Sequence, residues 1–327
     1  MKITFFSTQP YDHTFFEAAE ASADIEFIWN QHSLNEQTAA AINTEVICIF
    51  VNDVCNATVI AILAKQGVQL IALRCAGFNN VDLEAAANNN ISIVRIPAYS
   101  PYAVAEHTLA LLLTVNRKTH KAYNRVREQN FSLDGLLGFD LHGKTIGVIG
   151  TGNIGQVFCT IMLGLGCKVL AYDLIANKAM EKAGVEYTHL IDLFERSDII
   201  SLHCPLNEST QHIINAHSLS MMKNGVVIIN SSRGALIETN DAIDSLKSGK
   251  IGALAIDVYE QESTLFFRDL SSSIIADDTI QRLMSFPNVL VTAHQAFFTK
   301  EALTQIASIT LNNIKAWKAG KPENLVK

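Results

Sequence analysis

Residues 145–155 read Thr-Ile-Gly-Val-Ile-Gly-Thr-Gly-Asn-Ile-Gly, an apolar run that leads into the glycine pattern Gly150-x-Gly152-x-x-Gly155. The run predicts a buried parallel strand. The apolar residues that follow at helical spacing predict a helix behind it. A strand, a tight glycine turn and a helix start place free backbone N–H groups and the positive end of a helix dipole against a phosphate. The stretch therefore predicts a pyrophosphate cradle.

A second expected strand, residues 168–172, ends in Asp173. The dinucleotide-binding pattern places an acid here, where it accepts hydrogen bonds from ribose hydroxyls. The alternative is that Asp173 only begins a turn. The agreement of strand, glycines, helix and acid favours the dinucleotide. NAD is expected over NADP, because Asp173 would repel a 2′-phosphate and Leu174 to Ala176 offer no arginine to pair it.

Composition limits the class of protein. A chain of 327 residues is long enough for two domains, and 49% hydrophobic with 17% charged residues indicates compact globular structure. A net charge of -7 without a basic stretch argues against nucleic acid as a partner. With no 18-residue apolar run and no signal-like N-terminus, we expect a cytoplasmic protein that does not enter the membrane. Six cysteines without metal-ligand spacing predict buried reduced thiols and no metal site.

The order of elements predicts two domains. Residues 1–95 alternate strands and helices without a glycine pattern of their own, with strands expected at 3–7, 25–28, 46–49, 70–73 and 92–94 and helices at 14–22 and 57–66. Pro97 and Pro101 mark a crossing between domains, and a helix over residues 300–318 is expected to return to the first one. The fold class is therefore α/β: two doubly wound, Rossmann-like parallel-sheet domains with a cleft between them. Residues 1–100 with 299–327 would form the substrate domain, and residues 101–298 the NAD-binding domain.

In the second domain, one long helix is expected over residues 102–127. Its apolar first half must be covered on more than one face, by the domain core, by a subunit interface or by both. Glu106 and His107 within it suit a structural or hinge role, because neighbours in a helix point about 100° apart. Five strands are expected after Gly155, at 168–172, 199–202, 226–230, 254–257 and 289–292, which gives a six-stranded sheet with the strand before the glycines.

Polar residues follow the later strands, where open parallel sheets bind their ligands. Arg233 stands in a Ser-Arg-Gly turn, where its planar fork could clamp a substrate carboxylate, unless it forms a salt bridge with a neighbouring acid. His294 follows the last strand and suits proton transfer near neutral pH, although a lone histidine is more often structural. Glu260 and Glu262 both arrive at the same edge.

Six motifs in this order resemble the D-2-hydroxyacid dehydrogenase family, and within it the fermentative D-lactate branch. They occupy residues 74–82, 97–107, 147–155, 232–236, 257–262 and 292–298. Ala293 and Gln295 to Phe297 replace a proline and a glycine that are common in the wider family, which fits the D-lactate branch. The stretch from Thr264 to Phe286 departs from the family's short form and has no assigned role.

The resemblance implies the site residues. The substrate-binding arginine falls on Arg233, its acid partner on Glu262 and the acid/base histidine on His294. Substrate contacts fall on Ala76, Gly77, Tyr99 and Phe297. NAD contacts fall on Gly150, Gly152, Asn153, Ile154, Gly155, Asp173, Cys204, Pro205, Ser232 and Asp257.

The resemblance also implies the reaction, a reversible NADH-dependent reduction of pyruvate to D-lactate by a homodimer or homotetramer. Glu262 would favour the protonated form of His294. Two alternatives stay open. One is a dehydrogenase of the same family that acts on a larger 2-keto acid, and the other is an NAD-sensing, corepressor-like binding protein.

Overall fold

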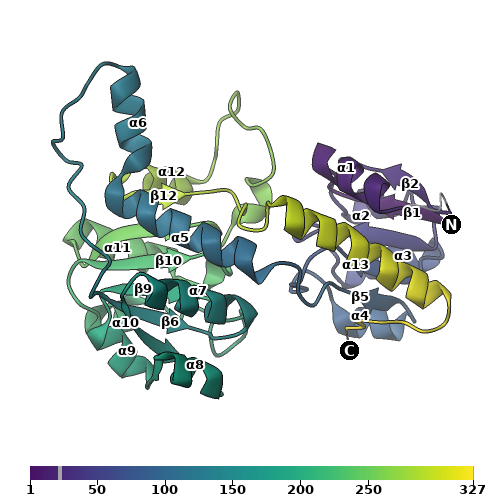
Figure 1. Ribbon diagram of the computed structural model, residues 1–327. Helices are drawn as coiled ribbons and strands as arrows, with labels where there is room; N and C mark the ends of the chain where they lie inside the picture. Colours follow the sequence, from purple (N-terminus) through teal and green to yellow (C-terminus); the bar gives the residue numbers. More distant parts are fainter. Residues whose placement is uncertain (21–23, 327) are drawn as a thin grey trace. The chain divides into compact units, whose positions relative to one another are not determined.

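The computed structural model describes residues 1–20 and 24–326. The chain forms two compact units, Met1–Ser100 with Phe298–Lys327, and Pro101–Phe297 (Figure 1). Each unit contains one all-parallel sheet with helices between its strands. Both units are therefore doubly wound α/β structures, which confirms the predicted fold class.

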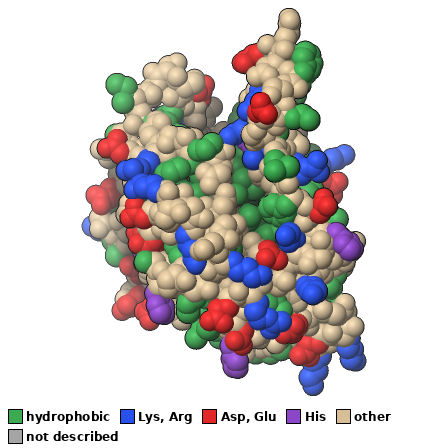
Figure 2. All heavy atoms as spheres, turned by 90° about the vertical axis from the view of Figure 1, so that its left-hand side faces the viewer, with side chains coloured by type: hydrophobic (Ala, Val, Ile, Leu, Met, Phe, Trp, Pro, Cys, Tyr) green, Lys and Arg blue, Asp and Glu red, His purple; other side chains and the backbone are tan. Residues whose placement is uncertain are grey.

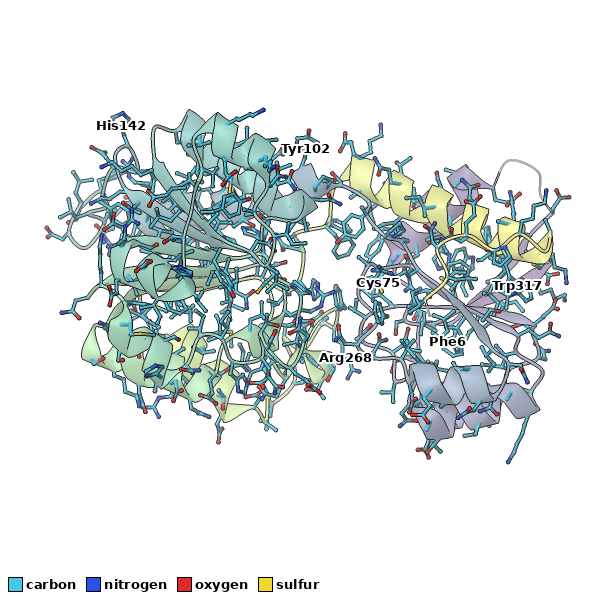
Figure 3. All side chains as sticks on the ribbon, turned by 90° about the horizontal axis from the view of Figure 1, so that it is seen from below. Phe6, Cys75, Tyr102, His142, Arg268 and Trp317 are labelled. Carbon is cyan, nitrogen blue, oxygen red and sulfur yellow. The ribbon has the colours of Figure 1, made fainter. Side chains whose placement is uncertain are left out.

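The first unit is a five-stranded sheet in the order β2-β1-β3-β4-β5. Its strands are β1 (Lys2–Phe5), β2 (Glu26–Trp29), β3 (Val46–Ile49), β4 (Leu70–Leu73) and β5 (Ser92–Val94). Its helices are α1 (Pro10–Ala19), α2 (Glu36–Ala39), α3 (Ala57–Lys65), α4 (Leu83–Asn88) and α13 (Lys300–Lys318). Figure 3 shows α13 on one side of this sheet and other helices on the opposite side, with Phe6 and Cys75 within the unit.

Four predicted elements of this unit have different bounds in the structure: β2 lies one residue later than predicted, α3 ends one residue earlier, and β1 and α1 differ by more. β1 ends at Phe5 rather than residue 7, because Ser7 takes a left-handed backbone conformation with φ of 51°. α1 begins at Pro10 rather than residue 14, since proline suits the first turn of a helix and the Asp12 carboxylate accepts a hydrogen bond from Gln9 N at 2.9 Å. The predicted end of this helix at Ser22 lies outside the described residues.

The second unit is a seven-stranded sheet in the order β12-β11-β10-β9-β6-β7-β8. Its strands are β6 (Thr145–Ile149), β7 (Lys168–Tyr172), β8 (Glu186–Tyr187), β9 (Ile199–Leu202), β10 (Val226–Asn230), β11 (Ile251–Ile256) and β12 (Val289–Val291). The prediction of six strands was one short. β8 pairs with β7 at the edge of the sheet and has only two residues, so it contains no apolar run from which the sequence could predict a strand.

The helices of this unit are α5 (Pro101–Arg117), α6 (Thr119–Arg127), α7 (Asn153–Gly164), α8 (Lys178–Ala183), α9 (Leu190–Arg196), α10 (Ala216–Met221), α11 (Thr239–Ser248) and α12 (Asp278–Ser285). The single helix predicted over residues 102–127 is thus two helices. They are separated at Lys118, whose φ of 52° is left-handed and interrupts the helix. Figure 1 shows α6 projecting from the unit.

Two apolar clusters cover the faces of the second sheet. Ile146 and Val148 of β6 join the cluster that contains Phe158 of α7 and Leu112 of α5, whereas Ile149 joins the cluster that contains Leu193 of α9. Alternate residues of the strand thus face opposite clusters, as the period of a strand requires. The six cysteines are buried and free, as predicted. Within residues 1–20 and 24–326, no helix has both the length and the apolar character needed to span a bilayer.

Candidate active site and dinucleotide site

The glycine turn after β6 requires two of its three glycines on steric grounds. Gly150 has a φ of 92°, and a Cβ atom there would lie 2.5 Å from the backbone nitrogen of Cys204. A Cβ atom at Gly155 would lie 2.0 Å from the carbonyl oxygen of Gly150. Any side chain at these positions would therefore push the strand, the turn and the helix apart.

The third glycine leaves room for a ligand. Gly152 is the N-cap of α7, and no side chain of the described residues caps this helix end. A Cβ atom at Gly152 would meet nothing within 4 Å, so the space beside the turn is open. The first N–H groups of α7, which include those of Asn153 and Ile154, can therefore bind an anion that approaches along the helix axis. A dinucleotide pyrophosphate fits this turn.

Asp173 follows β7 and is already held by the glycine turn. Its Oδ2 atom accepts hydrogen bonds from Thr151 N at 2.6 Å and Thr151 Oγ1 at 2.9 Å. Its Oδ1 atom accepts one from Leu174 N at 2.7 Å. Thr151 occupies a variable position of the glycine pattern, so sequence reasoning did not identify it as a site residue.

Two further predicted NAD residues join the loops after β9 and β10. Ser232 Oγ donates to the carbonyl oxygen of Cys204 at 2.8 Å, and Ser232 N donates to Asn230 Oδ1 at 3.0 Å. Burial raises the pKa of the Cys204 thiol to about 11, so this cysteine stays protonated near neutral pH. Pro205, which follows it, is exposed.

Arg233 follows β10 and forms a hydrogen bond within its own turn. Its Nη1 atom donates to the Ser232 carbonyl oxygen at 2.7 Å, and Arg233 is partly buried. In the described part of the chain, no acid forms an ion pair with this guanidinium. The structure thus rejects the salt-bridge alternative and leaves donors of the fork free for an anionic ligand.

Glu262 and His294 form the second part of the same sheet edge. His294 Nδ1 lies 2.7 Å from Glu262 Oε1, and Glu262 Oε2 accepts a hydrogen bond from Tyr259 N at 2.9 Å. The side chains of His294 and Glu262 are 16% and 21% exposed, so the pair is shielded yet reachable. β11 lies between β10 and β12 in a parallel sheet, so the loops that carry Arg233, Glu262 and His294 leave the same edge.

Asp257 fixes the turn that presents His294. This buried carboxylate accepts hydrogen bonds from Thr292 Oγ1 at 2.5 Å, Gln295 N at 2.9 Å and Ala296 N at 2.9 Å. The Asp257 carbonyl oxygen accepts a further one from His294 N at 2.7 Å. These bonds hold His294 in a left-handed backbone conformation with φ of 52°.

His107 of α5 also contacts Asp257. Its Nε2 atom lies 3.4 Å from Asp257 Oδ1 and 3.3 Å from Thr292 Oγ1. Burial opposes ionisation of Asp257, but the hydrogen bonds from His107, Thr292 and the turn lower its pKa below the ordinary value. His107 therefore has the structural role predicted for it. The predicted NAD contact of Asp257 stays a prediction.

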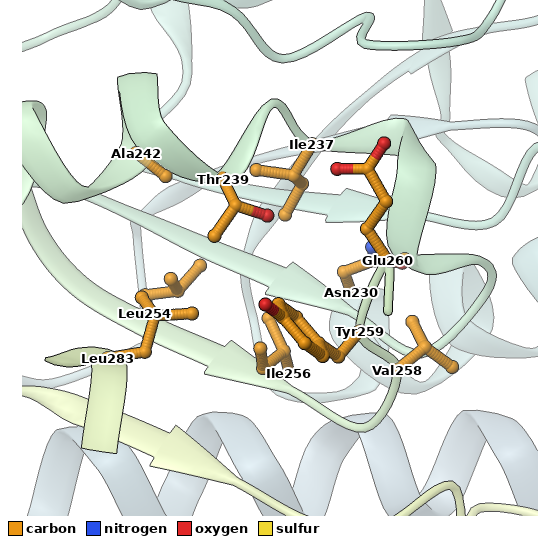
Figure 4. Close-up of a pocket in the computed structure, with 11 residues that line it drawn as sticks. Asn230, Ile237, Thr239, Ala242, Leu254, Ile256, Val258, Tyr259, Glu260 and Leu283 are labelled. Atoms are coloured by element: carbon orange, nitrogen blue, oxygen red, sulfur yellow. The ribbon is translucent and has the colours of Figure 1, made fainter. Parts of the chain in front are cut away.

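The two acids two residues apart have different partners. Glu260 pairs with His212, at 2.9 Å between Oε1 and Nε2, and lines a mostly apolar hollow beside β10 and β11 (Figure 4). Neither Arg233 nor His294 lines this hollow. Glu262, not Glu260, is the carboxylate that contacts His294.

The predicted substrate residues belong to both units. Ala76 and Gly77 follow β4 and are partly buried, and Arg95 Nη1 donates to the Ala76 carbonyl oxygen at 2.7 Å. Tyr99 is also partly buried. Phe297 is only 6% exposed and ends the second unit. Their contacts with a substrate stay predictions.

The stretch from Thr264 to Phe286, which had no predicted role, contains a side chain that contacts the His294 ring. The ring of Phe267 lies 5.9 Å from the His294 ring, centroid to centroid. Tyr259 Oη donates to both carboxylate oxygens of Asp277, at 3.1 Å and 2.9 Å, and Asp277 caps the start of α12. This segment therefore shields the Glu262–His294 pair, and no motif in the sequence predicted this contact.

A parallel sheet with an open glycine turn, an uncapped helix start and an acid after the next strand defines a dinucleotide-binding domain. Residues 109–296, more than half of the chain, match the family model for the NAD-binding domain of D-isomer specific 2-hydroxyacid dehydrogenases. The chain is 52% identical over 316 residues to 2-hydroxyacid dehydrogenase homolog 1 of Schizosaccharomyces pombe, covering 96% of this chain and 95% of that protein. It is 49% identical over 329 residues to D-lactate dehydrogenase of Escherichia coli, covering 100% of both chains.

Solved structures agree with this match. The apo structure of the Escherichia coli D-lactate dehydrogenase superposes with a TM-score of 0.91 at 46% identity and covers 100% of both chains. The Aquifex aeolicus D-lactate dehydrogenase, complexed with NAD and lactic acid, superposes with a TM-score of 0.86 at 33% identity, covering 98% of this chain and 96% of that one. The chain belongs to the D-isomer specific 2-hydroxyacid dehydrogenase family, and it is an oxidoreductase whose cofactor is NAD.

Proposed function

We propose that this protein is a D-lactate dehydrogenase that reduces pyruvate to D-lactate with NADH and catalyses the reverse oxidation. The observation that carries the proposal is the 2.7 Å contact between His294 and Glu262 on the sheet edge that also presents Arg233. A small 2-keto acid needs a cation for its carboxylate and a proton donor for its carbonyl oxygen. These three residues supply both. The 49% identity to the Escherichia coli enzyme favours pyruvate among such acids.

In this proposal Arg233 binds the substrate carboxylate and polarises the keto group. His294 donates a proton from Nε2 to the keto oxygen during reduction and accepts it back during oxidation. Glu262 contacts Nδ1, which orients the ring and favours its protonated form. Positioned charges and fixed geometry carry the rate.

NADH, when bound, supplies the hydride. The residues that would hold its pyrophosphate are Gly150, Gly152, Asn153, Ile154 and Gly155. Asp173 would accept from a ribose hydroxyl and exclude a 2′-phosphate, and Cys204, Pro205, Ser232 and Asp257 would complete the site. Ala76, Gly77, Tyr99 and Phe297 are proposed to contact the substrate, which assigns substrate binding to the first unit and NAD binding to the second.

We further propose a cytoplasmic homodimer or homotetramer. Six free, buried thiols suit a reducing compartment. α6 and the segment after it expose large apolar side chains, which a second copy of the chain could cover (Tyr123, Val126, Phe131, Leu133, Leu137). On the face drawn in Figure 2, acidic and basic side chains are interspersed, without a basic patch that would suit nucleic acid.

Steady-state NADH oxidation with a panel of 2-keto acids tests the proposal. We expect the highest kcat/KM for pyruvate, graded lower values for phenylpyruvate, 2-ketoisocaproate and hydroxypyruvate, and D-lactate as the product. A preference for a larger acid would assign the protein to another activity of the family, which the general name of the Schizosaccharomyces pombe relative leaves open. NADH binding without turnover of any member would favour the NAD-sensing alternative.

A further inference from the structure

Three side chains form a directed hydrogen-bond chain beside the glycine turn. Tyr187 Oη donates to Thr151 Oγ1 at 2.9 Å, and Thr151 Oγ1 donates to Asp173 Oδ2 at 2.9 Å. The direction is fixed, because an ionised carboxylate only accepts and a threonine hydroxyl has a single proton to give. Thr151 is only 4% exposed, so this chain is largely sheltered from water.

The two-residue strand β8 brings Tyr187 to this position. β8 pairs with β7, with Tyr187 opposite Ala171, and Thr188 N donates to the Ala171 carbonyl oxygen at 3.0 Å. The edge strand thus carries a side chain that reaches back to the glycine turn. The NAD site described above includes the contact of Thr151 with Asp173 but gives Tyr187 no role.

The two carboxylate oxygens of Asp173 accept different numbers of hydrogen bonds. Oδ2 accepts from both Thr151 N and Thr151 Oγ1, whereas Oδ1 accepts from Leu174 N alone within the described part of the chain. An ionised carboxylate offers about four lone-pair sites, so Oδ2 is saturated and one site remains on Oδ1. A ribose hydroxyl can therefore be accepted at Oδ1 without displacing a protein donor.

We propose that Thr151, supported by Tyr187, is a positioning residue that determines cofactor specificity by locking Asp173 with Oδ1 toward the adenosine ribose of NADH. This inference rests on the proposed ribose contact of Asp173. An Asp173 carboxylate held by Thr151 cannot rotate away from a 2′-phosphate. The hydrogen bonds from Thr151, which we call the lock, therefore strengthen discrimination against NADPH as well as binding of NADH.

Thr151→Val tests the lock, because valine keeps the shape and the backbone N–H but removes the hydroxyl. We expect kcat/KM for NADH to fall roughly tenfold, because the variant loses a hydrogen bond to a charged group, which is stronger than one between neutral groups. The ratio of the dissociation constants of NADPH and NADH, measured by fluorescence titration without a keto acid, should decrease. Reduced nicotinamide mononucleotide lacks the adenosine ribose, so its kcat/KM should not change. Thr151→Ser should restore the NADH value, and Thr160→Val, at an exposed threonine of α7, is the matched control.

Tyr187→Phe leaves the glycine turn intact and gives a second readout should Thr151→Val fail to fold. We expect a loss of two- to fourfold in kcat/KM for NADH, again without an effect on reduced nicotinamide mononucleotide. Because Tyr187 acts through Thr151, Tyr187→Phe should cause no further loss in the Thr151→Val background. Additive losses would overturn the role assigned to Tyr187.

Asp173→Ala separates failure of this inference from failure of the proposed function. If Asp173→Ala narrows the cofactor preference and Thr151→Val does not, the lock is overturned and the ribose contact stands. If Asp173→Ala leaves the preference unchanged, the ribose contact itself fails, and the lock fails with it. An equal loss with NADH and reduced nicotinamide mononucleotide in Thr151→Val would show a general disturbance of the turn and overturn the lock.

Discussion

An arginine follows a strand in each of the two sheets, and the two arginines have opposite surroundings. Arg74, after β4, is 2% exposed, lies 3.3 Å from the Asp12 carboxylate and donates to the Ser7 carbonyl oxygen at 3.0 Å. Arg233, after β10, is partly buried, and among the described residues its guanidinium donates only to the adjacent Ser232 carbonyl oxygen. The same architecture thus uses one arginine to hold its own loops and leaves the other for a ligand. Function depends on the residues at the strand ends rather than on the fold.

The largest effect on activity should come from His294, which follows β12 at the carboxyl edge of the second sheet. His294→Ala should lower kcat for pyruvate reduction at every pH, by about 10²–10⁴-fold, which is the usual contribution of a positioned acid. NADH affinity, measured by fluorescence titration, should stay close to that of the unaltered protein. Retention of more than a tenth of the activity would remove His294 from the chemistry.

Arg74→Met should instead affect stability. Breaking a buried ion pair typically costs about 3–5 kcal/mol, because Asp12 would be left as an unpaired buried charge. Urea unfolding at neutral pH measures this loss. The double variant Arg74→Met with Asp12→Leu should recover part of the lost free energy of unfolding. An Arg74→Met protein of unchanged stability would contradict the contrast between the two arginines.

Substitutions in the two acid–histidine pairs should have different effects on the pH profile of kcat/KM for pyruvate. Glu262→Gln removes the carboxylate 2.7 Å from His294, so the alkaline fall-off of kcat/KM for pyruvate should move to lower pH. Glu260→Gln changes only the partner of His212 and should leave the profile in place. The opposite pattern would exchange the roles of the two acids.

The smallest expected effect on activity concerns His203, which follows β9 and lies 2.9 Å from Ser201 Oγ. Burial lowers the pKa of His203 to about 3, well below the reference of about 6.5 for an unfolded chain. Between these values the unfolded state binds a proton that the folded state does not. The stabilisation is therefore complete above about pH 6.5 and declines as the pH falls toward 3.

His203→Gln should accordingly flatten the loss of stability on acidification. Urea unfolding at pH values on both sides of the histidine transition checks this difference between variant and unaltered protein. The pH profile of kcat/KM should not move, since His203 is neutral at every working pH.

The sequence predicted the parts of the fold that a repeated pattern announces. Apolar runs identified the strands at residues 46–49, 70–73 and 226–230 with the bounds found in the structure. The break at Lys118 and the strand β8 were not predictable in this way. A lysine carries no signal for a left-handed conformation, and two residues are too few to show a period.

The site divides along the same line. The glycines and Asp173 followed from a spacing that has a steric and electrostatic reason. Arg233 and His294 were candidates because they follow strands, and the family resemblance selected Glu262 and assigned the three roles. Thr151 and Tyr187 are joined to Asp173 only by folding, since 22 and 14 positions separate them along the chain. Contacts of this kind leave no local pattern.

The central claim is that Arg233 is kept free for a substrate carboxylate, and the most direct test is kcat/KM for pyruvate in Arg233→Gln, measured together with its free energy of unfolding. Losing one partner of a hydrogen-bonded charge pair costs about 2–5 kcal/mol, so we expect a fall of about 10²-fold or more. The free energy of unfolding should change by less than about 0.5 kcal/mol, because the guanidinium has no acidic partner within the described chain. An active Arg233→Gln protein, or one as destabilised as Arg74→Met, would contradict the account.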